Sequence, residues 1–79
     1  MTKIYNFTVL FQKAEEGGYV ATVPLLPGCV TQGETFEQTQ KQIKDAIAGY
    51  LTVLKEDNEE IPWENEEHIA ATVSVPVTT

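Results

Sequence analysis

The spacing of the apolar residues changes at Thr35, and this change limits the possible folds more than any other feature of the sequence. Before Thr35, apolar and polar residues alternate in the segment 4–11, which predicts a strand with one buried face. The shorter segments 19–23 and 29–32 predict two further strands. After Thr35, apolar residues recur at helical spacing as far as Lys55. The sequence therefore predicts three strands followed by one long helix.

The predicted helix has a start signal and a single apolar stripe. Thr35 and Gln38 stand three residues apart, as in a capping box, where the two side chains satisfy backbone N–H groups at the helix start. Lys55 lies where the carbonyl groups of the last turn favour a positive charge. We expect one face of the helix to cover the sheet. The residues of this stripe are Phe36, Ile43, Ile47, Tyr50, Leu51 and Leu54.

Glycine and proline residues mark the connections between the strands. Gly17 and Gly18 favour a hairpin turn, and Pro24–Gly28 favours a stiff connection that ends the second strand. The segment 69–75 alternates again and predicts a fourth strand, which a right-handed crossover through the helix returns parallel to the first strand and beside it. We predict one α+β domain over residues 1–79. Its architecture is a β-β-β-α-β two-layer sandwich, with an antiparallel meander of three strands, strand order 3-2-1-4 and the helix on one face.

The charge distribution limits the possible partners. Five lysines and no arginine stand against twelve acidic residues, which gives a net charge of −7. Such a surface repels nucleic acid, so we expect no direct nucleic-acid binding. The acidic excess lies between Glu34 and Glu67, and two interpretations stay open: a solvated loop that keeps the protein in solution, or a surface that attracts a basic partner. The sequence contains no membrane-length apolar stretch and no signal segment, so we expect a cytoplasmic protein without membrane contact.

The reactive residue types do not form a pattern that predicts catalysis. Metal-dependent RNA cleavage needs several converging carboxylates, but the first predicted strand contains no acid and Asp45 lies on the polar side of the helix. Cys29 is interpreted as a small buried apolar residue, and with His68 as the only histidine, no zinc site of nitrogen and sulfur ligands fits within one chain. We expect no enzyme activity, metal or cofactor. Trp63 has two interpretations, packing over the helix end or serving as an exposed anchor for a basic partner.

Residues 18–36 carry a pattern of glycine, proline and cysteine that resembles the HicB family of antitoxin-like proteins. In that family, a G-Y-x-A-x-x-P-x-L-P-G-C-x-x-x-G-x-T segment leads into an amphipathic helix. The resemblance implies a truncated ribonuclease H fold and neutralisation of HicA, a small basic toxin that cleaves messenger RNA. Many members also have a C-terminal DNA-binding segment; because this sequence ends at Thr79, after the predicted fourth strand, we expect none here. The matching residues are Gly18, Tyr19, Ala21, Pro24, Leu26, Pro27, Gly28, Cys29, Gly33 and Thr35.

The sequence departs from the family pattern at one position of the loop. Family members usually have an acidic residue after the first proline, where this sequence has Leu25. Leu25 and Leu26 are therefore candidates for an apolar contact with the partner. The predicted partner-binding residues are Pro24, Leu25, Leu26, Pro27, Gly28, Cys29, Glu34, Glu37 and Trp63.

Two hypotheses follow for the function. The first is a non-catalytic protein-binding module that neutralises a small basic HicA-like ribonuclease toxin by covering the surface that RNA would use. The alternative is a solitary domain without a toxin, which binds a small ligand or forms a homo-oligomer through its sheet edges or its open sheet face. Formation of a complex with a toxin would distinguish the two.

Overall fold

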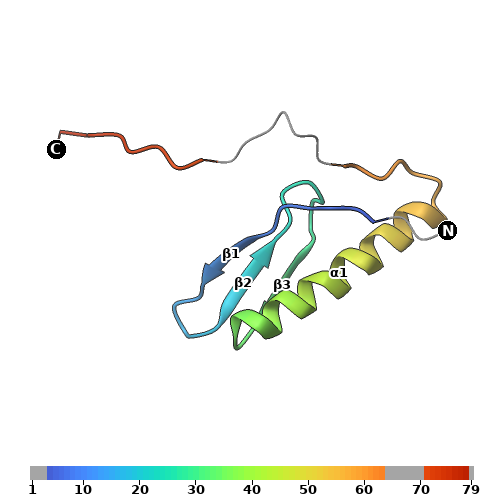
Figure 1. Ribbon diagram of the computed structural model, residues 1–79, viewed down its shortest axis with the longest axis horizontal. Helices are drawn as coiled ribbons and strands as arrows, with labels where there is room; N and C mark the ends of the chain where they lie inside the picture. Colours follow the sequence, from blue (N-terminus) through green and yellow to red (C-terminus); the bar gives the residue numbers. More distant parts are fainter. Residues whose placement is uncertain (1–3, 64–70, 79) are drawn as a thin grey trace.

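A computed structural model describes residues 4–63 and 71–78, and they contain one antiparallel sheet and one helix (Figure 1). The sheet has the order β1-β2-β3, and α1 lies across one of its faces (Figure 1). The predicted α+β class, the meander of three strands and the single long helix are confirmed. The elements are β1 (Leu10–Lys13), β2 (Tyr19–Thr22), β3 (Val30–Gly33) and α1 (Phe36–Glu56).

Two glycines shape the turn between β1 and β2, as the sequence predicts. Gly17 and Gly18 have φ angles of 101° and 81°, which residues with a side chain rarely adopt. The Ala14 N–H donates to the Gly18 carbonyl at 3.0 Å, and the Gly17 N–H donates to the Ala14 carbonyl at 3.1 Å. A Cβ atom on Gly18 would lie 2.5 Å from the carbonyl oxygen of Gly33 in β3. Gly18 is therefore required for space as well as for conformation.

The first strand begins later than the sequence predicts. β1 starts at Leu10, whereas alternation predicts a strand over 4–11. The reason is the end of β2: Thr22 is the last β2 residue paired with β1, and Pro24, whose backbone nitrogen comes next on that side, has no N–H to offer. The ladder between β1 and β2 therefore stops at Leu10. Burial still alternates along 4–11, so the predicted buried face is correct. Its half-buried members are Tyr5, Phe7, Val9 and Phe11.

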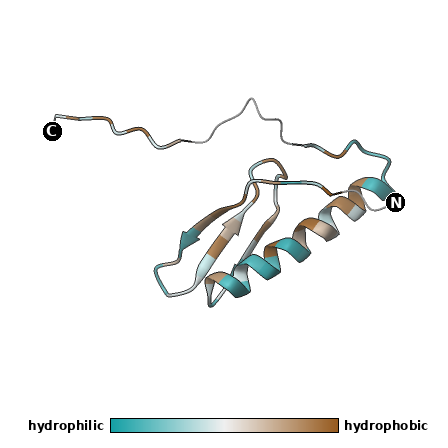
Figure 2. Cartoon of the chain, viewed as in Figure 1, coloured by the Kyte–Doolittle hydropathy of each residue, from teal (hydrophilic) through white to brown (hydrophobic). Residues whose placement is uncertain are grey.

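The core lies between the sheet and α1. Figure 2 shows apolar stretches in the strands and alternating apolar and polar bands along α1, as expected for a helix with one buried side. The rings of Phe11 in β1 and Phe36 in α1 stack with their centroids 4.6 Å apart, which joins the sheet to the helix start. The buried apolar residues are Ala21, Val23, Leu26, Cys29 and Ile43, with Phe7, Val9, Phe11, Ala46, Ile47, Tyr50 and Leu51 packed against them.

The helix start has the predicted cap. The Gln38 N–H donates to Thr35 Oγ1 at 3.0 Å, which satisfies one free donor of the first turn. In return, the Gln38 side chain accepts a hydrogen bond from the Glu34 N–H at 2.8 Å, one residue before the usual position in a capping box. At the other end, the Asp57 N–H donates to the Val53 carbonyl at 3.0 Å, so α1 ends one residue beyond Lys55.

Residues 71–75, the described part of the predicted fourth strand, are not part of this sheet. The first residues of that predicted strand, Ile69 and Ala70, lie outside the described residues, whereas residues 71–75 are described and run as an exposed, extended stretch (Figure 1). Alternation of apolar and polar residues indicates that a segment has one apolar face, but it does not indicate which surface covers that face. No part of the described chain covers the apolar face of residues 71–75. The predicted order 3-2-1-4 is therefore confirmed only for its first three strands.

Candidate partner-binding surface

The connection between β2 and β3, the proline loop (Pro24–Cys29), is held in shape by backbone hydrogen bonds. The Leu26 N–H donates to the Val23 carbonyl at 3.1 Å, and the Cys29 N–H donates to the Leu26 carbonyl at 3.0 Å. These bonds form two successive tight turns, and the bond from Val23 N–H to the Cys29 carbonyl closes the loop at its base. Gly28 has a φ of 83°, a conformation that glycine adopts without steric cost. The candidate contact segment therefore has a defined backbone.

The residues of the proline loop divide into a buried and an exposed group. The side chains of Leu26 and Cys29 lie in the core, where they hold the loop against α1. A partner cannot reach these two side chains without opening the core. Of the two leucines predicted as apolar contacts, Leu25 is the half-buried one that keeps an exposed surface. The fully exposed residues of the loop are Pro24, Pro27 and Gly28.

A side chain of α1 ties the proline loop to the helix. The Tyr50 hydroxyl donates to the Pro27 carbonyl at 2.9 Å. Tyr50 also packs against the core, so its ring and its hydroxyl both help to position the loop. This arrangement brings the exposed side of the loop next to the second half of α1.

Two exposed valines beside the proline loop were not among the predicted contact residues. Val30 is 53% exposed and Val53 is 54% exposed, and both border a shallow hollow that also includes Gly28, Tyr50 and Glu59. The sequence contains a signal for Val53, because it lies outside the apolar stripe that faces the sheet. An apolar residue on the wet side of an amphipathic helix is a candidate contact. Val30 carries no comparable signal, because its strand is too short to assign its faces.

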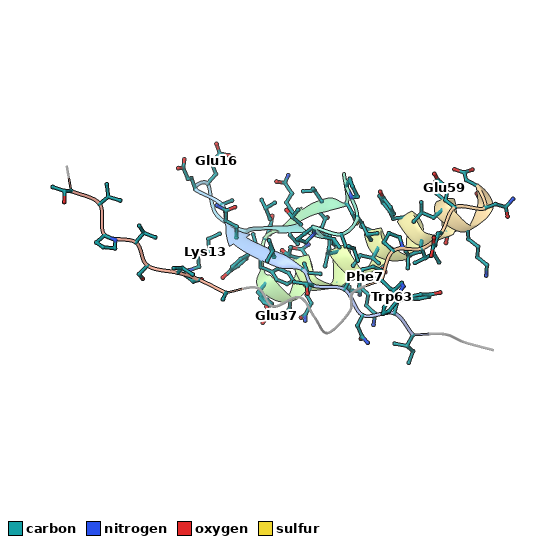
Figure 3. All side chains as sticks on the ribbon, turned by 90° about the horizontal axis from the view of Figure 1, so that it is seen from above. Phe7, Lys13, Glu16, Glu37, Glu59 and Trp63 are labelled. Atoms are coloured by element: carbon teal, nitrogen blue, oxygen red, sulfur yellow. The ribbon has the colours of Figure 1, made fainter. Side chains whose placement is uncertain are left out.

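Glu34 and Glu37 lie at the other end of the sheet. Both are exposed near the start of α1, and β3 separates them from the proline loop along the length of the molecule (Figure 1). Glu34 borders a hollow that it shares with Glu15 and Glu16 of the hairpin turn. Figure 3 shows the same division: Glu16 and Glu37 lie toward one end of the sheet and helix, and Glu59 and Trp63 toward the other. The predicted contact residues therefore form two separate groups.

Trp63 joins the group that includes the proline loop. It is 66% exposed, in agreement with the interpretation as an exposed ring rather than a residue packed over the helix end. It borders a hollow with Ile4, Glu59 and Glu60. Glu59 borders both this hollow and the hollow beside Val30 and the loop. We call this area the loop-end surface; it consists of Pro24, Leu25, Pro27, Gly28, Val30, Val53, Glu59, Glu60 and Trp63.

The titratable groups of the described chain do not converge on a reactive centre. Burial raises the pKa of the Cys29 thiol because the thiolate would lose its hydration, so the thiol stays protonated at neutral pH. Asp45 is exposed on α1. In residues 4–63 and 71–78, no three His, Cys, Asp or Glu side chains lie close enough to hold a metal ion. The same part of the chain contains no helix with the length and apolar character needed to cross a membrane.

Comparisons with known proteins agree with the resemblance noted in the sequence. The family model described as HicB-like antitoxin of bacterial toxin-antitoxin system matches residues 7–77. A UPF0150 protein of Thermoplasma acidophilum is 49% identical over 64 residues, which cover 81% of this chain and 93% of the relative. A UPF0150 protein of Synechocystis is 43% identical over 63 residues, 80% of each chain. Antitoxin HicB of Escherichia coli is 38% identical over 57 residues, which cover 72% of this chain but only 41% of that antitoxin.

Fold and surface define a small α+β domain whose candidate contacts lie on its outside. With the family match over residues 7–77, the assignment is direct: the chain belongs to the family of HicB-like antitoxins of bacterial toxin-antitoxin systems.

Proposed function

We propose that this protein is an antitoxin that binds a small basic toxin of the HicA type and blocks it by covering the surface that RNA would use. The observation that carries the proposal is the family match over residues 7–77. The net charge of −7 supports it, because long-range attraction speeds the encounter of an acidic protein with a basic one. In this mechanism the protein contributes no catalytic step. Inhibition results from occlusion alone.

We assign the main contact to the loop-end surface. The backbone of its proline loop is already held by two turns and by the bond from Tyr50 to Pro27, so binding does not have to order that part of the surface. Val30 and Val53 offer apolar contact area, and Glu59 offers a carboxylate at its border. In this assignment, Leu26 and Cys29 act by holding the loop from the core.

Glu34 and Glu37 have a different part in the proposal. They lie at the far end of the sheet with Glu15 and Glu16, so one small partner seated on the loop-end surface does not need to touch them. Their charge still adds to the attraction during the encounter. We therefore propose that these glutamates affect the association rate more than the dissociation rate.

The test is a calorimetric titration of the full chain with a purified, catalytically inactivated HicA-type toxin. We expect a one-to-one complex whose affinity falls as salt is raised, because salt screens the attraction between opposite charges. Val53→Lys, which places a positive charge in the contact, should weaken binding about tenfold or more. The matched control is Thr52→Lys, an exposed position with the same change of charge, which should alter the affinity by less than about threefold. Absence of a complex at low salt would refute the proposal, and equal effects of the two variants would refute the assigned surface.

The proposal also includes a fourth strand of the sheet. We propose that the segment from residue 71 forms the fourth strand beside β1, which would complete a partial ribonuclease H-like sheet of order 3-2-1-4. Support comes from the position of β1 at a sheet edge and from the alternating valines after residue 71. The same exposed edge and valines also support the alternative function, a solitary homo-oligomer. Dimer formation together with no toxin binding at low salt would favour that alternative.

A further inference from the structure

The C-terminal stretch 71–77, the valine segment, has the pattern of an edge strand but lies away from the sheet (Figure 1). Val73, Val75 and Val77 occupy alternate positions and are 78%, 72% and 76% exposed. Thr72 and Ser74 stand between them, and the segment contains no charged residue. Valine side chains gain free energy when they leave water, so three of them on one face of an extended segment indicate a surface that another surface covers.

A largely apolar groove runs along residues 5–11, the stretch that leads into β1, and Phe11 is the β1 residue that lines it. In the described part of the chain, β1 pairs with β2 and is an edge of the sheet. The backbone of α1 crosses β2 and β3 and stays away from β1, which leaves an open space on that side of the helix. This β1 groove has a volume of about 810 Å³. Its apolar walls are Phe7, Val9, Phe11, Ile43, Ile47 and Leu51.

The groove and the valine segment match in geometry and chemistry. A strand placed beside β1 directs alternate side chains toward the helix layer, so Val73 and Val75 would enter the groove while Thr72 and Ser74 would face outward. Its backbone would pair with the open edge of β1, as in other cases of strand addition. Pro76 follows directly, and a residue without an N–H suits the end of such a strand.

We propose that two copies of this chain exchange their valine segments, each copy placing residues 71–75 beside β1 of the other. The course of the segment favours a second copy, because it extends away from its own sheet and helix (Figure 1). A reciprocal exchange covers both grooves and both segments and gives a closed twofold dimer. This inference rests on the fourth strand proposed above, and it does not require a toxin.

The first experiment measures the mass of the full chain in solution by sedimentation velocity over a wide range of concentration. We expect a dimer of twice the 8.8 kDa chain mass. Val73→Lys combined with Val75→Lys should raise the dimer dissociation constant about tenfold or more, because two charges would enter an apolar groove. Thr72→Lys combined with Ser74→Lys adds the same charge to the opposite face and should leave the dimer within about threefold of the original.

The second experiment measures hydrogen exchange of the amides of residues 71–75 at concentrations above and below the dimer dissociation constant. Exchange should be slow in the dimer and fast in the monomer, because the segment gains its backbone partners only from a second copy. The salt dependence of the affinity distinguishes this dimer from a complex with a toxin. Two copies of net charge −7 repel each other, so added salt should strengthen the dimer, whereas it should weaken a complex with a basic toxin.

Three results would overturn the inference. A chain that stays monomeric at every concentration has no exchanged strand. A dimer that both lysine pairs affect equally is held by another surface. Slow exchange of residues 71–75 that does not depend on concentration means that the segment pairs with β1 of its own chain.

Discussion

Gly18 combines two constraints that the other glycines of the turns do not share. At Gly17 the backbone has a φ of 101° but open space around an added Cβ, whereas at Gly18 the φ is 81° and the Gly33 carbonyl is close. We predict that Gly17→Ala lowers the free energy of unfolding by about 1 kcal/mol, through conformation alone. Gly18→Ala should lower it by roughly 2–4 kcal/mol, because the clash with β3 adds to that strain. Urea denaturation of both variants measures the difference, and equal losses would contradict the close approach of the hairpin to β3.

Cys29 links stability to pH through its burial. Its thiol has a raised pKa in the folded protein, against an ordinary value of about 8.5 in the unfolded chain. Below that value the thiol is protonated in both states and stability is unaffected. As the pH rises above about 8.5, the unfolded chain releases the proton first, so the free energy of unfolding decreases until the folded thiol also ionises.

We predict that Cys29→Ala removes this part of the pH dependence. The variant should be less stable at neutral pH because it leaves a small cavity, but its free energy of unfolding should decrease less between neutral and alkaline pH. Urea denaturation at several pH values across that range measures how steeply the free energy of unfolding decreases with pH in the original protein and in the variant. Equal slopes for the two proteins would mean that the buried thiol does not control this titration.

At the residue scale, the sequence predicts chemistry better than orientation. The interpretation of Cys29 as a buried apolar residue is confirmed. Leu25 and Leu26 are identical in chemistry and adjacent in sequence, so the spacing of apolar residues does not distinguish the leucine that keeps an exposed surface from the one in the core. The two turns of the proline loop decide it, because they point Leu26 inward. Turn geometry of this kind is not evident from composition.

At the scale of elements, the helix start gives a test of capping. We predict that Thr35→Ala lowers the free energy of unfolding by about 1 kcal/mol, because the Gln38 N–H loses its acceptor at the helix start. The matched control is Thr52→Ala, an exposed position inside α1 whose hydroxyl donates to the Ala48 carbonyl. That substitution should change stability by less than about 0.5 kcal/mol, since alanine favours helix and compensates for the lost bond. Thermal or urea denaturation compares them, and similar losses would contradict the cap.

The elements differ in how well the sequence predicts them. The range of α1 follows from a period that persists over 21 residues and from the cap at Thr35. The bounds of the strands are harder to predict from the sequence, because alternation of apolar and polar residues indicates which face is buried but not which residues pair with a neighbouring strand. The segment 4–11 shows this: its buried face is correct, but the ladder begins only at Leu10, where β2 offers a partner. The segment 69–75 depends even more on its neighbour, since the surface that covers its valines is not in its own sequence.

At the scale of the whole molecule, distance along the chain is a poor guide to the composition of the site. Glu34 follows the proline loop by only five residues, but β3 carries it to the other end of the sheet. Glu59 is far from the loop in sequence, and the length of α1 brings it back beside Gly28 and Val30. The sequence could therefore predict which residues are suited to a contact, but not which of them share a surface. That grouping depends on the packing of α1 across the sheet.

The way in which the proline loop is held bears on how antitoxins and their toxins diverge during evolution. The loop's shape is fixed by backbone hydrogen bonds, by the conformation of Gly28 and by the buried Leu26, so the side chain of Leu25 is not needed for the shape itself. Leu25 can then be replaced over evolutionary time without unfolding the domain, and under the proposed function each replacement alters only what the loop recognises. If the proposed function holds, a cell that encodes several such systems can in this way keep each antitoxin matched to its own toxin, with little cross-inhibition between them.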